Sequence, residues 1–163
     1  MRPVRSMVVL LTLIACWFCS PLRSDGQSSD LPDATPFANI GAGSAVVANV
    51  DIVLPANQSQ IYFQNGAFTT YQQIDKKSPS CHLSTVGIPV VRKLVPGRKL
   101  IVTGTRFGNG TSNQYGDTLL FEDDTAVNQL QCSGGHKGPM TIGELKICFG
   151  GLFSLVQATP EIG

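Results

Sequence analysis

VDIVLPANQSQIYFQNGAFTTYQQIDKKSPSC, residues 50–81, is the stretch of sequence that decides the fold. It opens with an apolar strand at 51–54, which the following proline ends because proline has no N–H to donate to a ladder. Residues 60–64 form a second strand, and Asn65-Gly66 then supplies two residues that tolerate the positive φ of a type I′ hairpin turn. Residues 68–74, rich in aromatic and β-branched side chains, are expected to be the return strand.

Strand-like segments continue along the chain, and one segment has a helical pattern. Residues 45–50 lead into the first strand, and further strands are predicted at 81–86, 99–107, 117–121, 127–132 and 152–157. Thr141 and Glu144 have the spacing of a capping box, and Gly150-Gly151 is expected to end the helix that follows. We therefore expect a mainly β fold, a small antiparallel β-barrel or sandwich of about seven or eight short strands with one short C-terminal helix.

The amino terminus has the features of a signal peptide. Arg2 and Arg5 precede an apolar run at 7–18, which is shorter than the roughly 20 residues that span a bilayer. Its end, Leu13-Ile14-Ala15-Cys16, resembles the bacterial lipobox, and by that resemblance Cys16 receives diacylglyceride and becomes the mature amino terminus. The alternative is a soluble secreted protein that is cut further on, after Gly26.

These features divide the chain into a signal peptide at 1–15, a lipid-anchored disordered tether at 16–43 and a β domain at 44–159. Phe37 and Ile40 are apolar enough to dock on the domain, but nothing in the pattern requires it. Because Trp17 rather than aspartate follows the lipidated position, the resemblance favours the outer membrane, with the domain on the inner leaflet facing the periplasm.

Charge and composition limit the classes of partner. The formal net charge is +1, and it becomes −1 when Arg2 and Arg5 leave with the signal peptide. We therefore expect no basic patch for nucleic acid and no nucleic-acid partner. The expected partners are the membrane, through the lipid, and an unknown envelope protein or glycan.

The five cysteines invite a disulfide in an oxidising compartment. If Cys16 carries lipid, four cysteines remain, and the sequence alone does not choose among their three possible pairings. These four are Cys19, Cys81, Cys132 and Cys148.

Short motifs follow one another in a fixed order along residues 45–157. In this order they resemble a family of proteobacterial envelope proteins, often lipoproteins, that has no assigned activity. The resemblance implies the β fold and the envelope location, but no mechanism. The motifs are Leu54-Pro55-Ala56, Tyr62-Phe63-Gln64-Asn65-Gly66, Tyr71, Pro79-Ser80-Cys81, Pro96-Gly97, Leu130-Gln131-Cys132, Glu144 and Gly151-Leu152-Phe153-Ser154-Leu155.

The same resemblance implies a disulfide between Cys81 and Cys132, which occupy the two cysteine positions of the family. Cys148 is a departure from the family and is expected in the core as a small hydrophobe. Cys19 would be free in the tether. The rival pairing is Cys132 with Cys148.

We expect no catalytic residue, no metal and no cofactor. Neither His82 nor His136 has cysteine or histidine at metal-ligand spacing, and the chain lacks a Gly-x-Ser-x-Gly motif. The acidic turn at 122–124, with Asp117, lacks the spaced pattern of a calcium loop and is interpreted as a solvated turn.

The sequence therefore predicts a tethered envelope protein with a binding or structural role rather than an enzyme. One alternative is an envelope carbohydrate-active hydrolase that uses carboxylates such as Glu122, Asp123 or Glu144. Another is a non-lipidated secreted protein, for which a eukaryotic source would make Asn57 and Asn109 glycosylation acceptors.

Overall fold

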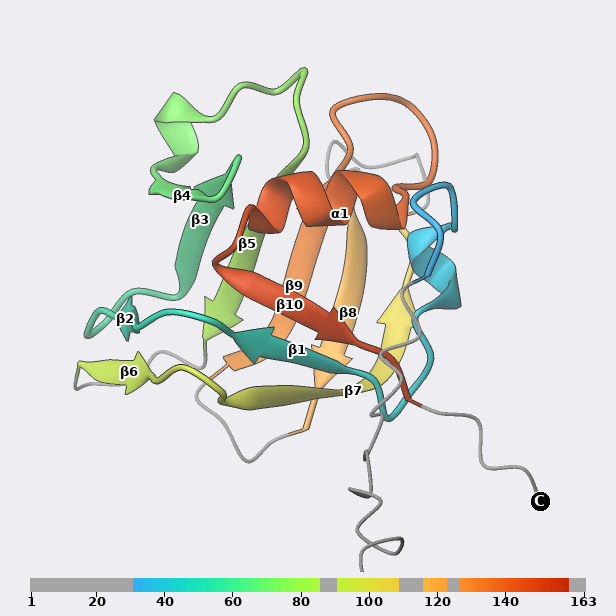
Figure 1. Ribbon diagram of the computed structural model, residues 1–163. Helices are drawn as coiled ribbons and strands as arrows, with labels where there is room; N and C mark the ends of the chain where they lie inside the picture. Colours follow the sequence, from blue (N-terminus) through green and yellow to red (C-terminus); the bar gives the residue numbers. More distant parts are fainter. Residues whose placement is uncertain (1–30, 86–90, 109–115, 123–126, 159–163) are drawn as a thin grey trace, which may run out of the picture.

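A computed structural model describes residues 31–85, 91–108, 116–122 and 127–158. This part of the chain is mainly β, as expected, with ten strands, one α-helix and two 3₁₀ helices (Figure 1). The strands outnumber the seven or eight that the sequence predicts because the segment at 45–54 holds two strands and a further strand precedes the turn at Pro96-Gly97.

Eight strands form one antiparallel sheet, which curls into a half-barrel (Figure 1). From edge to edge, its strands are β10 (Phe153–Val156), β1 (Ala45–Ala48), β7 (Lys99–Arg106), β8 (Asp117–Phe121), β9 (Val127–Ser133), β5 (Ser80–Thr85), β3 (Gln60–Gln64) and β4 (Ala67–Thr69). A separate two-stranded ribbon pairs β2 (Ile52–Leu54) with β6 (Arg92–Leu94).

The helix α1 (Ile142–Phe149) closes the open side of the half-barrel, because it packs against β3 near one end of the sheet and β10 at the other (Figure 1). Three rings from these elements meet in the core, with centroids 5.3 Å apart for Phe63 and Phe153 and 6.2 Å apart for Phe63 and Phe149. The backbone N–H of Gly66 donates to the carbonyl oxygen of Cys148 at 3.0 Å. The hairpin and the end of the helix are therefore bonded directly.

The local signals in the sequence are confirmed at the hairpin and at the helix start. Asn65 and Gly66 both have positive φ, at 51° and 73°. Thr141 and Glu144 form both hydrogen bonds of the capping box, and Gly150 ends α1 in the left-handed conformation.

Cys81 and Cys132 are bonded to each other, as the family resemblance implies. They lie directly opposite on neighbouring strands β5 and β9, and both are buried. Cys148 is fully buried in α1 and its thiol remains free, so the rival pairing of Cys132 with Cys148 is wrong.

The return strand of the hairpin is shorter than predicted. β4 ends at Thr69, and Tyr71–Gln73 forms a 3₁₀ helix, η2, instead of the second half of a strand at 68–74. β4 is an edge strand that pairs only with β3, and the pairing stops at Tyr62 opposite Thr69. β3 begins at Gln60, so in this register residues beyond Tyr71 would have no strand to pair with.

The tether was predicted to reach residue 43, and this boundary is wrong. Phe37 and Ile40 are buried in the core, and Phe37–Asn39 forms a 3₁₀ helix, η1. The backbone N–H of Phe37 donates to Met140, and Pro36 forms a β-bridge with Thr141. Residues 31–43 therefore belong to the folded body, because their apolar side chains fill space beside α1 that the strands leave open.

None of the helices in the part of the chain that the structure describes has the length and apolarity needed to cross a bilayer.

Candidate functional site

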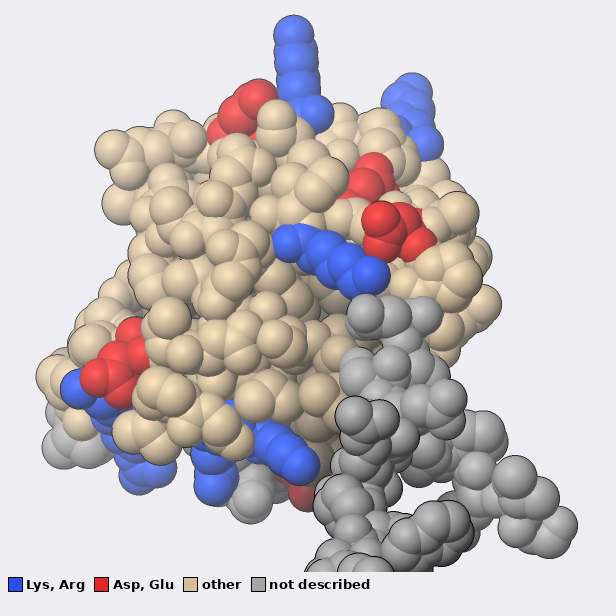
Figure 2. Space-filling model, viewed as in Figure 1, with Lys and Arg blue, Asp and Glu red and all other residues tan. Residues whose placement is uncertain are grey.

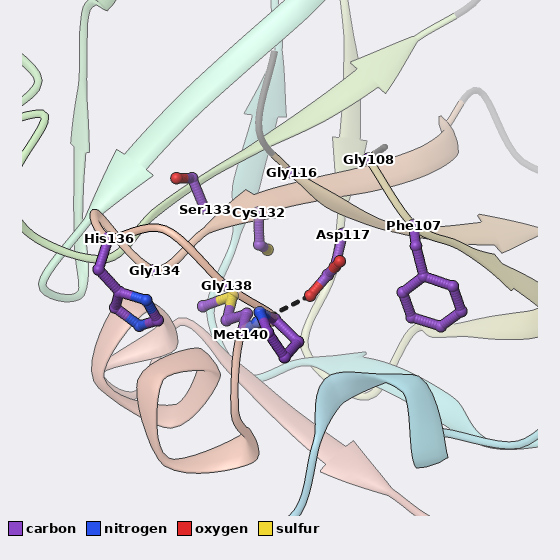
Figure 3. A pocket seen from close by; sticks show the side chains of 11 residues that line it. Phe107, Gly108, Gly116, Asp117, Cys132, Ser133, Gly134, His136, Gly138 and Met140 are labelled. Carbon is purple, nitrogen blue, oxygen red and sulfur yellow. Dashed lines mark hydrogen bonds between the residues drawn. The ribbon is translucent and has the colours of Figure 1, made fainter. Parts of the chain in front are cut away.

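The described residues form a pocket of about 310 Å³ at one end of the half-barrel (Figure 3). Four chain segments meet there: the residues just after β7, the start of β8, the end of β9 and the segment 134–140 that leads to α1. Ligand pockets in proteins usually measure about 300–1,000 Å³, so a small molecule fits this space. The lining residues are Phe107, Gly108, Gly116, Asp117, Cys132, Ser133, Gly134, His136, Gly138, Pro139 and Met140.

Asp117 places a carboxyl group in this mostly apolar pocket, and only 7% of the residue is exposed. One carboxyl oxygen, Oδ2, accepts the backbone N–H of Met140 at 2.9 Å (Figure 3). Burial raises the pKa of Asp117, the hydrogen bond from Met140 lowers it, and the nearby charge of Glu144 raises it further, so the net direction is upward. Within the described residues the other oxygen, Oδ1, has no hydrogen-bond donor, so it can accept one from a ligand.

A second polar group lies at the side of the pocket. His136 bonds through Nε2 to Oε1 of Glu144 at 2.5 Å, and the histidine is exposed. This bond raises the pKa of His136. Partial burial raises the pKa of Glu144, but the hydrogen bonds from Thr141 and His136 outweigh it and lower the pKa. At mildly acidic pH the pair is therefore an ion pair that holds segment 134–140 to the start of α1.

Phe107 supplies an exposed aromatic surface to the same pocket. Half of its surface is accessible, and Figure 3 shows its ring and the imidazole of His136 on opposite sides of Asp117. A ligand in the pocket can therefore meet an apolar ring, an acceptor oxygen and an imidazole at once. Such a mixture of apolar walls and few polar groups is typical of small-molecule sites.

The described residues hold no cluster of three or more histidine, cysteine, aspartate or glutamate side chains close enough to bind a metal ion. Asp117 does not meet Glu122, the residue of the acidic turn that the structure describes. Glu122 lies one residue past the far end of β8, about 17 Å from Asp117 at 3.3 Å per residue.

The carboxylates considered for hydrolysis are separated in the same way. Glu122 and Glu144 lie toward opposite ends of β8, because Glu144 interacts with Asp117 at its first residue. Asp123 lies outside the described residues. Both oxygens of Glu144 are engaged, Oε1 with His136 and Oε2 with Thr141, so this carboxylate is already bonded within the protein.

The remaining predicted site residues have different positions. Cys16 lies outside the described residues, and Asn109 does too. Cys81 and Cys132 form the disulfide, and Cys132 also lines the pocket. Asn57 lies in an exposed loop with a φ of 59°.

Sequence reasoning considered Asp117 only with the acidic turn, although one signal does single it out. Side chains of a strand alternate between faces, so Asp117 shares a face with Leu119 and Phe121, which are buried. A carboxyl group on the inward face of an apolar strand is the unusual feature, because carboxyl groups are rarely buried without a partner.

Comparison with known proteins adds no family assignment: no protein-family model, no curated protein and no solved structure matches this chain.

Proposed function

We propose that the protein is a lipid-anchored protein of the bacterial cell envelope whose β domain binds a small ligand in the Asp117 pocket. The motif Leu13-Ile14-Ala15-Cys16 at the end of the apolar leader supports the anchor. Since Trp17 follows the cysteine, the proposed location is the inner leaflet of the outer membrane, facing the periplasm. Residues 16–30 would then join the lipid to the folded body.

One observation carries the binding role: the nearly buried carboxyl group of Asp117 faces the pocket with one oxygen held by Met140. In the described part of the chain the other oxygen, Oδ1, is not one of the fully buried side-chain atoms that lack a hydrogen bond, so it is open to the pocket and can accept a hydrogen bond from a ligand. A ligand that also carries positive charge favours the ionised carboxyl group and lowers its pKa.

The ligand class follows from the same contacts. An amine or a hydroxyl group donates to Oδ1 of Asp117, and the apolar body of the ligand packs on Phe107 and Pro139. We propose a small amine or an amino sugar, consistent with a glycan partner in the envelope. Binding is favoured over hydrolysis because Glu144, the carboxylate whose charge acts on Asp117, is bonded to Thr141 and His136.

Amide NMR of the purified protein tests the binding role, with ethanolamine and glucosamine as probes. Ethanolamine offers an amine, and glucosamine adds a ring with hydroxyl groups. Saturable shifts are expected at the amides of Met140 and Gly138, which line the pocket. Asp117→Asn is expected to lose them, since the neutral amide neither attracts an amine nor keeps both acceptor oxygens.

Asp51→Asn is the matched control. Asp51 is an exposed aspartate that directly precedes β2, pairs with Lys93 and does not line the pocket. It should bind both probes like the wild type. Absence of pocket shifts with both probes, or equal shifts in Asp117→Asn, would contradict the proposed site. Release of a product from either probe would contradict the binding role.

A further inference from the structure

The ribbon of β2 and β6, together with the turn that leads to Lys99, carries a dense group of positive charges. We call residues 51–54 and 91–99 the basic ribbon. Residues 91–99 contain four of the nine lysine and arginine residues in the described part of the chain. All four are exposed, and Figure 2 shows basic side chains gathered along the lower edge of the visible face. The four are Arg92, Lys93, Arg98 and Lys99.

The basic ribbon contains a single acidic residue, Asp51, which pairs with Lys93 at 2.9 Å. Its formal charge is therefore +3, whereas the whole chain carries only +1. The expectation of no basic patch, which came from net charge, misses this local concentration. Neither Arg92 nor Lys99 is held in an ion pair within the described residues, so both are available to a partner.

Exposed valines lie among these charges. Val53, Val91 and Val95 are 52%, 64% and 53% exposed. Val53 pairs with Lys93, and positions 91, 93 and 95 alternate to the same face, so the three valines share the outward face of the ribbon. Lys93, opposite Val53, lies on this outward face as well. The inward face, with Ile52, Leu54 and Leu94, joins the core, and Arg92, opposite Leu54 on this side, is the exposed first residue of β6.

A short exposed ribbon that carries both positive charges and aliphatic side chains matches a specific partner. A soluble polyanion such as nucleic acid uses the positive charges but gives no place for three aliphatic side chains. An anionic bilayer offers both, since its headgroups attract lysine and arginine and the boundary of its acyl chains accepts apolar groups. We propose that the basic ribbon docks the β domain on an anionic phospholipid surface.

The length of chain before the folded body allows this contact, an argument that rests on the lipid anchor proposed above. Residues 16–30 reach at most about 50 Å when fully extended. A body of this size is about 35 Å across, as its expected radius of gyration of about 14 Å implies. An anchored domain can therefore turn any face to the membrane, and the basic ribbon would select which face.

Co-sedimentation with lipid vesicles tests the docking without the anchor. The chain from residue 17 onward is used, which lacks both the apolar leader and Cys16, so that neither the leader nor an attached lipid contributes. Vesicles of phosphatidylcholine with phosphatidylglycerol are compared with vesicles of phosphatidylcholine alone. Binding is expected only to the anionic vesicles, and it should weaken as salt is added.

Arg92→Gln/Lys99→Gln is expected to weaken binding about 30-fold, since each charge near an anionic surface contributes about fivefold. Val53→Ser/Val95→Ser should weaken it about tenfold through lost apolar contact. Lys76→Gln/Lys77→Gln is the matched control and should bind like the parent. It removes two exposed lysines that precede β5, whereas residues 91–99 of the basic ribbon follow that strand.

Three results overturn the proposal. One is equal binding to both kinds of vesicle, or none to either. Another is a control variant that loses as much as the ribbon variant. The third is full binding by the valine variant, which would show that the surface responds to charge alone and suits a soluble polyanion. Because the leader and Cys16 are absent throughout, none of these results depends on whether the anchor exists.

Discussion

Gly66→Ala tests how the half-barrel is closed. Gly66 lies in the hairpin turn with a φ of 73°, and its backbone N–H donates to Cys148 at the end of α1. A Cβ on Gly66 would lie 2.8 Å from the carbonyl oxygen of Gly150 and 3.0 Å from its Cα. Both of these are backbone atoms, so neither can rotate away.

Two costs add in this variant. A left-handed backbone conformation costs an alanine about 1–2 kcal/mol. Moving the hairpin away from Gly150 weakens the hydrogen bond to Cys148, which contributes about 0.5–1.5 kcal/mol, and loosens the packing of Phe63 against Phe149. The expected loss of unfolding free energy is therefore about 2–4 kcal/mol, a large share of the 5–15 kcal/mol typical of a domain.

Gly97→Ala is the control for strain alone. Gly97 has a φ of 85°, and a Cβ placed there meets no atom within 4 Å. It should lose only the 1–2 kcal/mol of conformational strain. Urea unfolding followed by circular dichroism, with the disulfide intact, gives both values. Equal losses in the two variants would refute the close contact between the hairpin and the end of α1.

Four further predictions concern other parts of the fold. Phe37→Ala should lower the free energy of unfolding in urea by about 3–5 kcal/mol, because the side chain is fully buried. A loss below about 1 kcal/mol would indicate that residues 31–43 belong to the tether and not to the folded body. Replacing Cys81 and Cys132 with serine should cost about 4 kcal/mol in the same assay by the chain-entropy model, since the disulfide spans 51 residues. In that experiment Cys148 should resist a thiol reagent until the protein unfolds, because burial raises its pKa to about 12. The raised pKa of His136 stabilises the fold fully below about pH 6.5, and this stabilisation is lost as pH rises through the pKa of His136 in the folded protein. The lowered pKa of Glu144 stabilises the fold fully above about pH 4.5, and this stabilisation is lost as pH falls through the pKa of Glu144 in the folded protein. His136→Gln should therefore lower the thermal midpoint more at pH 5.5 than at pH 8.5, and equal shifts would contradict the ion pair.

Most of the fold that the sequence predicts correctly follows from local rules. The turn at Asn65-Gly66 and the cap at Thr141 with Glu144 each depend on two residues and on backbone sterics that act over a few positions. Alternation placed the strands, because side chains that face the core must repeat every second residue.

The wrong predictions concern segments whose structure depends on residues far away in the chain. The segment at 68–74 has the side chains of a strand, but its neighbour β3 begins at Gln60, so residues beyond Tyr71 would have no strand to pair with. Phe37 is buried by α1 and its preceding segment, about 100 residues away in the chain, and no local pattern reports such a contact. Burial of this kind is set by the tertiary packing alone.

The pocket could not be predicted from the sequence for the same reason. Its walls come from the ends of three strands and from segment 134–140, which no single stretch of sequence brings together. The inward position of Asp117 follows from alternation with Leu119 and Phe121, but its bond to Met140 depends on how segment 134–140 returns across the sheet. Sequence reasoning could find the residue, but not its surroundings.

The intact mass of the mature protein, extracted from its native membrane, tests the central claim most directly. The account predicts a chain that begins at Cys16 and carries a lipid on it, with the mass of two hydrogens missing for the bond between Cys81 and Cys132. An unacylated chain that begins at Gln27 would contradict the anchor, and a mass without the missing hydrogens would contradict the disulfide.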